Sequence, residues 1–414
     1  MRKPRIISVF EHERLRIGDK GFTQVHLDAM LRLNDYHLGA YFEPISKGVK
    51  FSQYVGVIQV DGLIIEIHPK ADKDEDSTPW RGVLLNMLKA CGKLKASTTG
   101  AANVNRRHLN LLEVYFEFYL REIEGLTRMG LIKQYRNETK NVKALKGKLE
   151  FAGNLRQNLI HKERFYTTHQ VYDTNHLLHQ VLNHALEIVE EFTKGTRLYD
   201  FVKRVQLNFP EVDSRRISAK QLSKIKLNRK SAPYNYALEL ARLIILNYSP
   251  DIKGGQERML SLLFDMNELW EIYIYKQVLK AVQGTDIKVI PQDSKPFWGP
   301  NSLRPDIVLQ KDSKTYIIDT KWKRPMNKSA SIQDLRQMYA YCRFWNAEKA
   351  MLLYPGTPTN QSFKKYETDD YHKNGEEYPA QVEHACKLGF VSILNPNDQL
   401  DDMIGSKVLY LVDI

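Results

Sequence analysis

Two aspartates and a lysine in the last third of the chain have the types and spacing of a site that hydrolyses phosphodiester bonds. Asp306 precedes Asp319 by one short segment, and Lys321 follows Asp319 by two positions. Carboxylate oxygens hold Mg²⁺, which takes few protein ligands and keeps several waters. The metal lowers the pKa of a bound water and neutralises charge on the phosphate, while a lysine orients that water and offsets the repulsion between the carboxylates.

The segment around these residues, LRPDIVLQKDSKTYIIDTKWK, is expected to form a β-hairpin that brings them together. Strands are predicted over 304–310 and 315–321, with a tight turn between them. In a hairpin the start of the first strand faces the end of the second, so Asp306 meets Asp319. Residues two apart on a strand share a face, so Asp319 and Lys321 point the same way.

Predicted helices on either side of this hairpin supply further candidates. A helix expected over 261–283 has Glu268 and Glu271 among its acids, of which Glu271 is preferred as an additional metal ligand and Glu268 is the alternative. A helix expected over 331–347 places Gln337 and Tyr341 four residues apart on one face, either beside the site or in ordinary packing. The expected cofactor is Mg²⁺, with Mn²⁺ as a possible substitute, and its expected ligands are Asp306, Asp319, Glu271 and the carbonyl of Thr320.

Length and composition set the class of protein. The chain has 414 residues, which suggests two or three domains. No apolar run approaches the ~20 residues that span a bilayer, and charges follow closely on MRKPRIISVF, so neither a membrane span nor a signal peptide is expected. Three cysteines without a CxxC pair fit a reducing cytoplasm. The net charge of +12 favours a polyanionic partner such as double-stranded DNA.

An α+β multidomain fold is expected. The strongest local signal is a hairpin of Tyr54–Val60 and Leu63–His68 around Asp61-Gly62, a pair that suits a type I′ turn. The expected parts are a β-rich N-terminal region over 1–75, a mainly helical basic region over 76–250 and a C-terminal α/β domain over 251–414 with an acidic tail. Other predicted elements are helices over 79–90, 105–126, 174–194 and 234–247, and short strands over 133–135, 148–151, 286–291 and 350–354.

The trio of acidic and basic residues resembles the motif of the PD-(D/E)xK nuclease superfamily. Here it reads Pro305-Asp306, then Asp319-Thr320-Lys321. The pair Gln337 and Tyr341 resembles the QxxxY motif that RecB-like members place beside their site. The resemblance implies a restriction-endonuclease-like core in the C-terminal domain.

Other segments resemble the McrC proteins, the nuclease subunits of McrBC-type modification-dependent restriction systems. Blocks similar to that family occur in the same order over most of residues 5–355. One departure is Trp270-Glu271, where a Phe-Glu pair is usual, and it leaves the acid in place. The matching blocks are VGVIQVDGLIIEIHPK, GVLLNMLKACG, LKGKLEF, YDTNHLLHQVLNHAL and LLFDMNELWEIYI.

This second resemblance implies a partner, an AAA+ GTPase motor subunit resembling McrB that forms a ring and recognises the modified base. The chain contains no GxxxxGK[ST] motif, so it is expected to bind no nucleotide itself. The hairpin residues Tyr54, Asp61 and Gly62 are candidates for contact with the ring, although the same strands equally suit a sheet core. The resemblance does not choose among the basic residues that could assist the partner, such as Arg106, Arg107, Arg136 and Lys148.

Two rival functions remain open. A RecB-like exonuclease or a junction resolvase would use the same site, but the first 250 residues exceed what a minimal resolvase needs. A non-catalytic DNA-binding scaffold that only activates the GTPase would have no use for Asp306, Asp319 and Lys321. The histidines form no HExxH motif, so a zinc hydrolase is not favoured.

Overall fold

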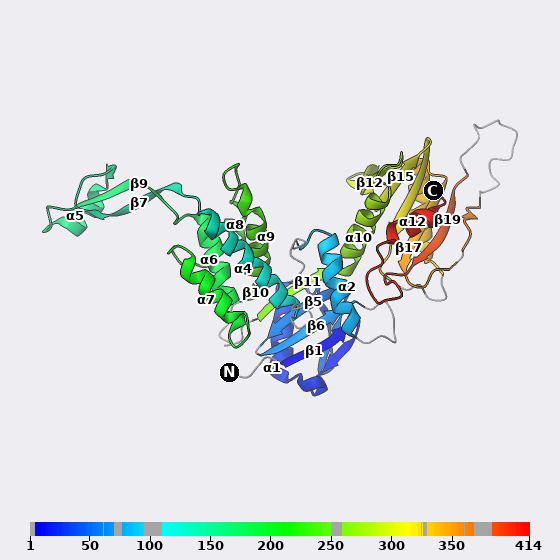
Figure 1. Cartoon of the computed structure of the whole chain (residues 1–414), viewed down its shortest axis with the longest axis horizontal. Helices are drawn as coiled ribbons and strands as arrows, with labels where there is room; N and C mark the ends of the chain where they lie inside the picture. Colours follow the sequence, from blue (N-terminus) through cyan, green and yellow to red (C-terminus); the bar gives the residue numbers. More distant parts are fainter. Residues whose placement is uncertain are drawn as a thin grey trace.

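The computed structural model describes residues 5–60, 62–69, 77–94, 110–249, 259–323, 325, 329–359, 361–367 and 383–414. These residues form an elongated molecule in which a sheet at the base carries two arms (Figure 1). One arm is a helical bundle that ends in a projecting β-structure. The other arm is a second sheet with helices on both faces, and it contains the candidate catalytic residues.

The sheet at the base, called here the N-terminal sheet, has strand order β1-β6-β5-β11-β10. Its central hairpin confirms the prediction residue for residue, with Gly62 at a φ of 76° in the turn. All six residues of β6 are buried, because helices and a smaller sheet cover both faces. The strands are β1 (Arg5–Phe10), β5 (Tyr54–Val60), β6 (Leu63–His68), β10 (Tyr248–Ser249) and β11 (Met259–Asp265).

One face of this sheet packs on a small cap, and the other packs on the helical part of the chain. The cap buries residues such as Leu27 and Met30 against Ile58 and Ile65. Its elements are β2 (Arg14–Arg16), α1 (Gln24–Tyr36), β3 (Phe42–Ile45) and β4 (Gly48–Phe51).

The segment predicted as one helix over 261–283 is divided between a strand and a helix, so that prediction was wrong in its first part. β11 pairs antiparallel with β5 over its whole length, from Met259↔Val60 to Asp265↔Tyr54. Helix α10 (Met266–Ala281) begins at the next residue, because the Asp265 side chain accepts from the backbone N–H of Asn267. The N-terminal sheet therefore includes a strand from beyond residue 250.

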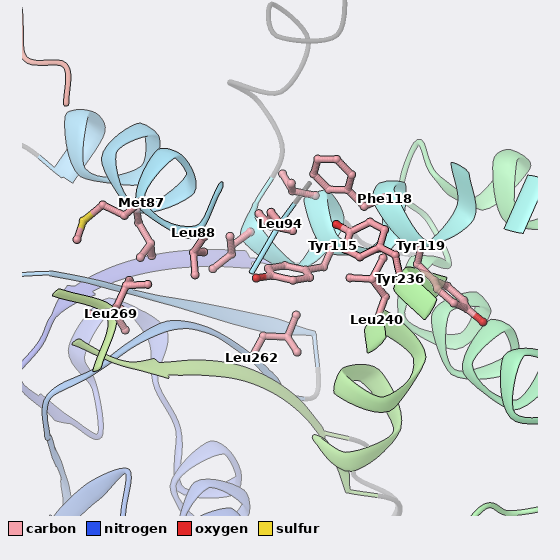
Figure 2. Packing of buried hydrophobic residues seen from close by; sticks show 14 of the residues in the cluster. Met87, Leu88, Leu94, Tyr115, Phe118, Tyr119, Tyr236, Leu240, Leu262 and Leu269 are labelled. Carbon is pink, nitrogen blue, oxygen red and sulfur yellow. The ribbon is translucent and has the colours of Figure 1, made fainter. Parts of the chain in front are cut away.

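The helical bundle and the N-terminal sheet share one hydrophobic core. Figure 2 shows Met87 and Leu88, Tyr115 and Tyr119, and Leu262 of β11 within this core. The buried ring of Tyr115 stacks on Phe264 at 5.9 Å. The helices are α2 (Ser77–Ala90), α4 (Leu111–Met129), α6 (Leu177–Thr193), α7 (Tyr199–Asn208), α8 (Ala219–Ser223) and α9 (Asn235–Leu246). Helices α2, α4, α6 and α9 confirm the four helices predicted for this region, although residues 95–109 lie outside the described part, whereas α7 and α8 were not predicted.

A long antiparallel pair projects from the bundle at the end of the molecule opposite the second sheet (Figure 1). We call residues 134–173 the β-arm. The sequence prediction found only short strands here, whereas β7 and β9 pair over nine residues each. At its root, His179 Nδ1 lies 2.8 Å from the carbonyl oxygen of Thr174. The elements of the β-arm are β7 (Gln134–Val142), β8 (Lys148–Leu149), α5 (Phe151–Asn158) and β9 (Phe165–Asp173).

The second sheet, called here the C-terminal sheet, has order β12-β15-β16-β17-β19-β18. Helices α10 and α12 cover one face and α11 covers the other, as the two separate sets of buried residues show. The elements are β12 (Lys288–Pro291), β15 (Ile307–Lys311), β16 (Lys314–Thr320), α11 (Ile332–Trp345), β17 (Lys349–Pro355), β18 (Lys364–Lys365), β19 (Ala385–Val391) and α12 (Ile404–Val412).

The two sheets are joined by a buried contact as well as by α10. The Trp322 side chain follows the end of β16 and donates from Nε1 to Oε1 of Glu11, 2.7 Å away. Its ring lies 5.5 Å from that of Trp270 on α10. Across the described ranges, no helix has the length and apolar character needed to cross a membrane.

Candidate active site

The hairpin β15–β16 places Asp306 and Asp319 at one edge of the C-terminal sheet, as predicted. The register pairs Ile307 with Ile318, so Asp306 and Asp319 occupy the next pair of positions along the ladder. Asp306 is fixed there, because its Oδ2 accepts from the Thr320 backbone N–H at 2.6 Å and from the Thr320 hydroxyl at 2.7 Å.

Asp319 and Lys321 share the face of the sheet that α11 covers. The Lys321 ammonium lies 2.7 Å from Asp319 Oδ2 and donates to Gln337 Oε1 at 3.4 Å. Gln337 donates in turn to the Tyr341 hydroxyl at 2.7 Å, and that hydroxyl donates to the backbone oxygen of Arg304 at 3.1 Å. Gln337 and Tyr341 therefore reach the candidate site and connect the lysine to the foot of β15.

The helix acid that faces this edge is Glu271 rather than Glu268. Glu268 is paired with Lys93 at 3.1 Å, on the side of α10 that meets the segment after α2. Glu271 accepts from the Gln292 side-chain amide at 2.7 Å, and burial together with the negative charge of Asp306 raises the pKa of its carboxyl. The two carboxylates therefore lie close enough to interact electrostatically.

Gln292 is a site residue that sequence reasoning missed. It follows β12 with a φ of 47°, and its backbone N–H donates to the carbonyl oxygen of Asp306 at 2.9 Å. One residue thus bonds both to Glu271 through its side chain and to Asp306 through its backbone. No motif marks it in the sequence, because its role depends on the pairing of β12 with β15.

Buried carboxylates dominate the electrostatics. Burial, together with the like charge of Asp306, raises the pKa of Asp319 to about 7, while Lys321 acts in the opposite direction. Burial also raises the pKa of Asp306, against its hydrogen bonds from Thr320. The pKa of Lys321 is raised by Asp319 although burial opposes this, so the lysine stays cationic. A bound cation would relieve this excess of negative charge.

The donor set fits a hard divalent cation. Asp306 and Asp319 offer carboxylate oxygens at one edge, and Thr320, the residue after Asp319, is bonded to Asp306 through its backbone N–H. In the part of the chain that the structure describes, no group of three or more His, Cys, Asp or Glu side chains is arranged to hold a metal ion. An open pair of carboxylates suits Mg²⁺, which keeps several waters, better than a structural zinc site.

The raised pKa of Asp319 predicts that Mg²⁺ binds more tightly as the pH rises through about 7. The folded-state pKa lies above the ordinary 3.8, so the stability contributed by protonated Asp319 is present below pH 3.8 and lost as the pH rises through about 7. Mg²⁺ needs the ionised form, so its binding reverses this loss. The increase in melting temperature on adding Mg²⁺ should be larger at pH 8 than at pH 6. An equal increase at both values, or the same pH dependence in Asp319→Asn, would contradict this.

Shortening the Gln292 side chain should weaken metal binding through Glu271. Asn tolerates the left-handed backbone at this position but cannot reach the carboxylate. Loss of one hydrogen bond to a charged group predicts an affinity for Mn²⁺ or Mg²⁺ about three- to tenfold lower, measured by calorimetry. In a Glu271→Gln background the same change should add nothing. An equal loss in both backgrounds would show that Gln292 acts elsewhere.

Tyr54, Asp61 and Gly62, the residues expected to contact the partner, belong to the β5–β6 segment and not to the candidate active site. Tyr54, on β5 of the N-terminal sheet, packs edge-on against Tyr41 of the cap at 4.9 Å. Gly62 is exposed in the turn, and Asp61 lies outside the described residues. Of the basic candidates, Arg136 bonds to Asp173 at 2.9 Å, Lys148 is exposed, and Arg106 and Arg107 are also outside the described part.

Comparison with protein families identifies the chain. A family model described as McrBC 5-methylcytosine restriction system component matches residues 49–355, well over half of the 414 residues. The chain belongs to this family. The matched span contains the N-terminal sheet's hairpin, the helical bundle and the site residues at Glu271, Asp306, Asp319 and Lys321. The resemblance of the sequence to a restriction system of the McrBC type is thereby confirmed.

Individual relatives of this McrBC-family chain agree. It is 19% identical over 274 residues to the "Type IV methyl-directed restriction enzyme EcoKMcrBC" of Escherichia coli (strain K12), covering 60% of this chain and 78% of that protein. A solved structure is the refined half-complex of the tetradecameric assembly of Thermococcus gammatolerans McrB AAA+ hexamers with bound McrC. One of its chains superposes on this chain with TM-score 0.69 and 18% identity, and the superposition covers 99% of each chain.

A chain of the Thermococcus gammatolerans McrBC complex gives TM-score 0.51 and 19% identity, covering 67% of this chain and 88% of that one. At these identities the structures establish a shared fold.

Proposed function

We propose that this chain is the McrC-type nuclease subunit of an McrBC restriction system, which hydrolyses phosphodiester bonds in double-stranded DNA with Mg²⁺. The observation that carries the proposal is the convergence of Asp306, Asp319 and Lys321 at one sheet edge, with Gln337 bonded to the lysine and Tyr341 bonded to Gln337. The arrangement fits a restriction-endonuclease-like core of the PD-(D/E)xK type. The motif alone would be weak, and membership of the McrBC family strengthens it.

In this proposal Asp306, Asp319 and the carbonyl of Thr320 hold the metal. Glu271, which in the described structure is not grouped with the two aspartates closely enough to hold an ion, would complete the ligand set when the metal binds. When bound, Mg²⁺ would supply an activated water and neutralise charge on the phosphate. Thr320 keeps the Asp306 carboxylate pointed at the site through two hydrogen bonds. Gln292 holds Glu271 toward the same edge.

Lys321 is the residue proposed to orient the attacking water. Its ammonium has three N–H donors, and within the described structure Asp319 and Gln337 account for two of them. The third donor is available for the water or for a phosphate oxygen. The contacts of Gln337 with Lys321 and of Tyr341 with Arg304 hold the lysine in place, so it needs little reorganisation during the reaction.

The proposed partner is an AAA+ GTPase resembling McrB. The related structure contains McrB AAA+ hexamers with bound McrC, and this chain covers 99% of the chain it matches there. The expected contact at the tip of the Tyr54–His68 hairpin remains a proposal limited to the turn, because the strands themselves are interior strands of the N-terminal sheet.

The β-arm offers a larger surface for such a partner. It stands at the end of the molecule opposite the C-terminal sheet (Figure 1). Its exposed apolar side chains include Tyr135, Phe151, Leu155, Ile160 and Tyr172. A protrusion with apolar side chains in water is typical of an interaction site.

The test is cleavage of methylated plasmid DNA by the full chain, with and without the GTPase, in Mg²⁺ and GTP. Cleavage only with the partner supports the proposal. Cleavage by the chain alone favours an autonomous nuclease of the RecB-like or resolvase kind. Stimulated GTP hydrolysis without cleavage, under conditions where the DNA is bound, identifies a non-catalytic scaffold.

A further inference from the structure

A short hairpin rises from the candidate site and ends in an exposed tryptophan. Its strands, β13 (Lys295–Trp298) and β14 (Asn301–Leu303), form a two-stranded sheet separate from the C-terminal sheet. Trp298 is 74% exposed, directly before the turn at Gly299-Pro300. A large ring held out in water at this place has no evident role in the core.

Both legs of this hairpin are fixed at the candidate site. The backbone N–H of Gln292 donates to the carbonyl oxygen of Asp306 and closes the base. On the first leg, Trp345 donates from Nε1 to Asp293 Oδ2 at 2.6 Å. On the second leg, the Tyr341 hydroxyl donates to the backbone oxygen of Arg304. The position of the tip is therefore coupled to the residues proposed to hold the metal.

Phe297 and Trp298, the two aromatic residues near the tip, have different surroundings. The ring of Phe297 lies 5.5 Å from that of Phe344 on α11, so it braces the hairpin against this helix. The register shifts between Pro296 and Trp298, as in a β-bulge, and such irregularities redirect side chains. Among the ring contacts found in the described structure, none involves Trp298, so its face is available for a ligand.

The surroundings of the hairpin carry positive charge. Arg304 is exposed at its foot, and α11 exposes Arg336 and Arg343, which share a face because they are seven residues apart. Guanidinium groups contact DNA phosphates. At about 3.3 Å per residue, the first leg from Asp293 to Trp298 spans up to about 17 Å. That length exceeds the depth of about 8 Å of either groove of B-DNA.

We propose that residues 293–304 form a DNA wedge, in which Trp298 inserts at a base step of the duplex and so sets the position of the phosphate cleaved at Asp306 and Asp319. Aromatic and apolar wedges unstack base steps, and stacking on an aromatic ring tolerates any sequence. The proposal rests on the proposed nuclease function, and it names duplex DNA as the ligand of this surface.

The test measures binding rather than cleavage, in the full chain carrying Asp319→Asn so that DNA stays intact. A labelled duplex with 2-aminopurine at single steps reports affinity by anisotropy and unstacking by fluorescence. Trp298→Ala should lower affinity about five- to twentyfold and remove the fluorescence increase, whereas Trp298→Phe should restore most of both. Tyr410→Ala, which removes an equally exposed ring from α12, should change neither.

The outcomes separate the two proposals. Equal affinity and unchanged 2-aminopurine fluorescence in Trp298→Ala would overturn the wedge. The wedge would also be overturned if Trp298→Ala bound DNA normally but no longer stimulated the GTPase, because the hairpin would then be a contact for the partner. A third outcome is that unstacking depends on Trp298 while the unaltered chain, with Asp319 intact, never cleaves DNA. That outcome would support the wedge and reject the nuclease function.

Discussion

Replacing Asp319 with asparagine should lower DNA cleavage by at least about three orders of magnitude. Asparagine has the same shape but lacks the negative charge that the metal requires, and metal stabilisation is worth several kcal/mol in the transition state. The fold should survive, because the site loses a buried carboxylate that is 2% exposed and whose ionisation burial opposes. The measurement is the rate of plasmid cleavage with the GTPase partner, in saturating Mg²⁺.

Two controls keep this result specific. Asp312→Asn removes an acid from the turn at the other end of the same hairpin, and it should leave the cleavage rate unchanged. Stimulation of GTP hydrolysis by Asp319→Asn should equal that of the unaltered chain, since the partner surface is proposed elsewhere. Cleavage retained by Asp319→Asn would place the catalytic site in another part of the molecule.

Replacing Trp322 with alanine should destabilise the whole chain by roughly 3–5 kcal/mol. The side chain is 7% exposed, its ring packs near Trp270, and its indole N–H donates to the buried Glu11. Alanine leaves a cavity and takes a donor from a carboxylate in the interior. Because Trp322 follows Lys321 and Trp270 precedes Glu271, cleavage should also fall. Denaturant unfolding, followed by circular dichroism, measures the change in stability.

Trp322→Phe separates the two causes. It keeps an aromatic ring between the sheets and removes only the donor to Glu11, so the expected loss is about 1–3 kcal/mol. Losses of equal size in the phenylalanine and alanine variants would assign the whole effect to the hydrogen bond. A loss below about 1 kcal/mol in Trp322→Ala would show that this contact does not hold the two sheets together.

The local signals in the sequence predicted the elements on which the site depends. Asp61-Gly62 marked the hairpin of β5 and β6 to the residue, because a two-residue turn fixes the register on both sides. The hairpin β15–β16 was also predicted, and with it the meeting of Asp306 and Asp319, although β15 begins three residues later than expected and the turn is Asp312-Ser313 alone.

Elements whose structure depends on pairing with a distant segment could not be predicted from local sequence patterns. The run MLSLLFD is apolar at almost every position, so its periodicity does not separate a helix from a buried strand, and only its pairing with β5 decides. The β-arm did carry a usable signal in the β-branched and aromatic residues of FYTTHQVYD, which favour a strand over 165–173.

The candidate site was predictable for the residues that lie on or beside the neighbouring strands β15 and β16 and on the helix that follows them, α11. Gln337 and Tyr341 were correctly predicted to share one face of a helix, because the i, i+4 spacing fixes that face. Gln292 was missed because its bonds to Glu271 and Asp306 cross three elements. The contact of Trp322 with Glu11 joins residues 311 positions apart, a separation at which pattern carries no information.

The position of β11 has a consequence for how such a chain can evolve. β11 lies between β5 and β10, and it runs directly into the helix that carries Glu271. A truncation that removed residues 259–414 would strip β5 of its neighbour β11 and expose an edge prone to aggregation. Simple truncation therefore cannot remove the C-terminal sheet with its candidate site and leave the N-terminal sheet intact, and selection for folding alone preserves the segment that leads into the site.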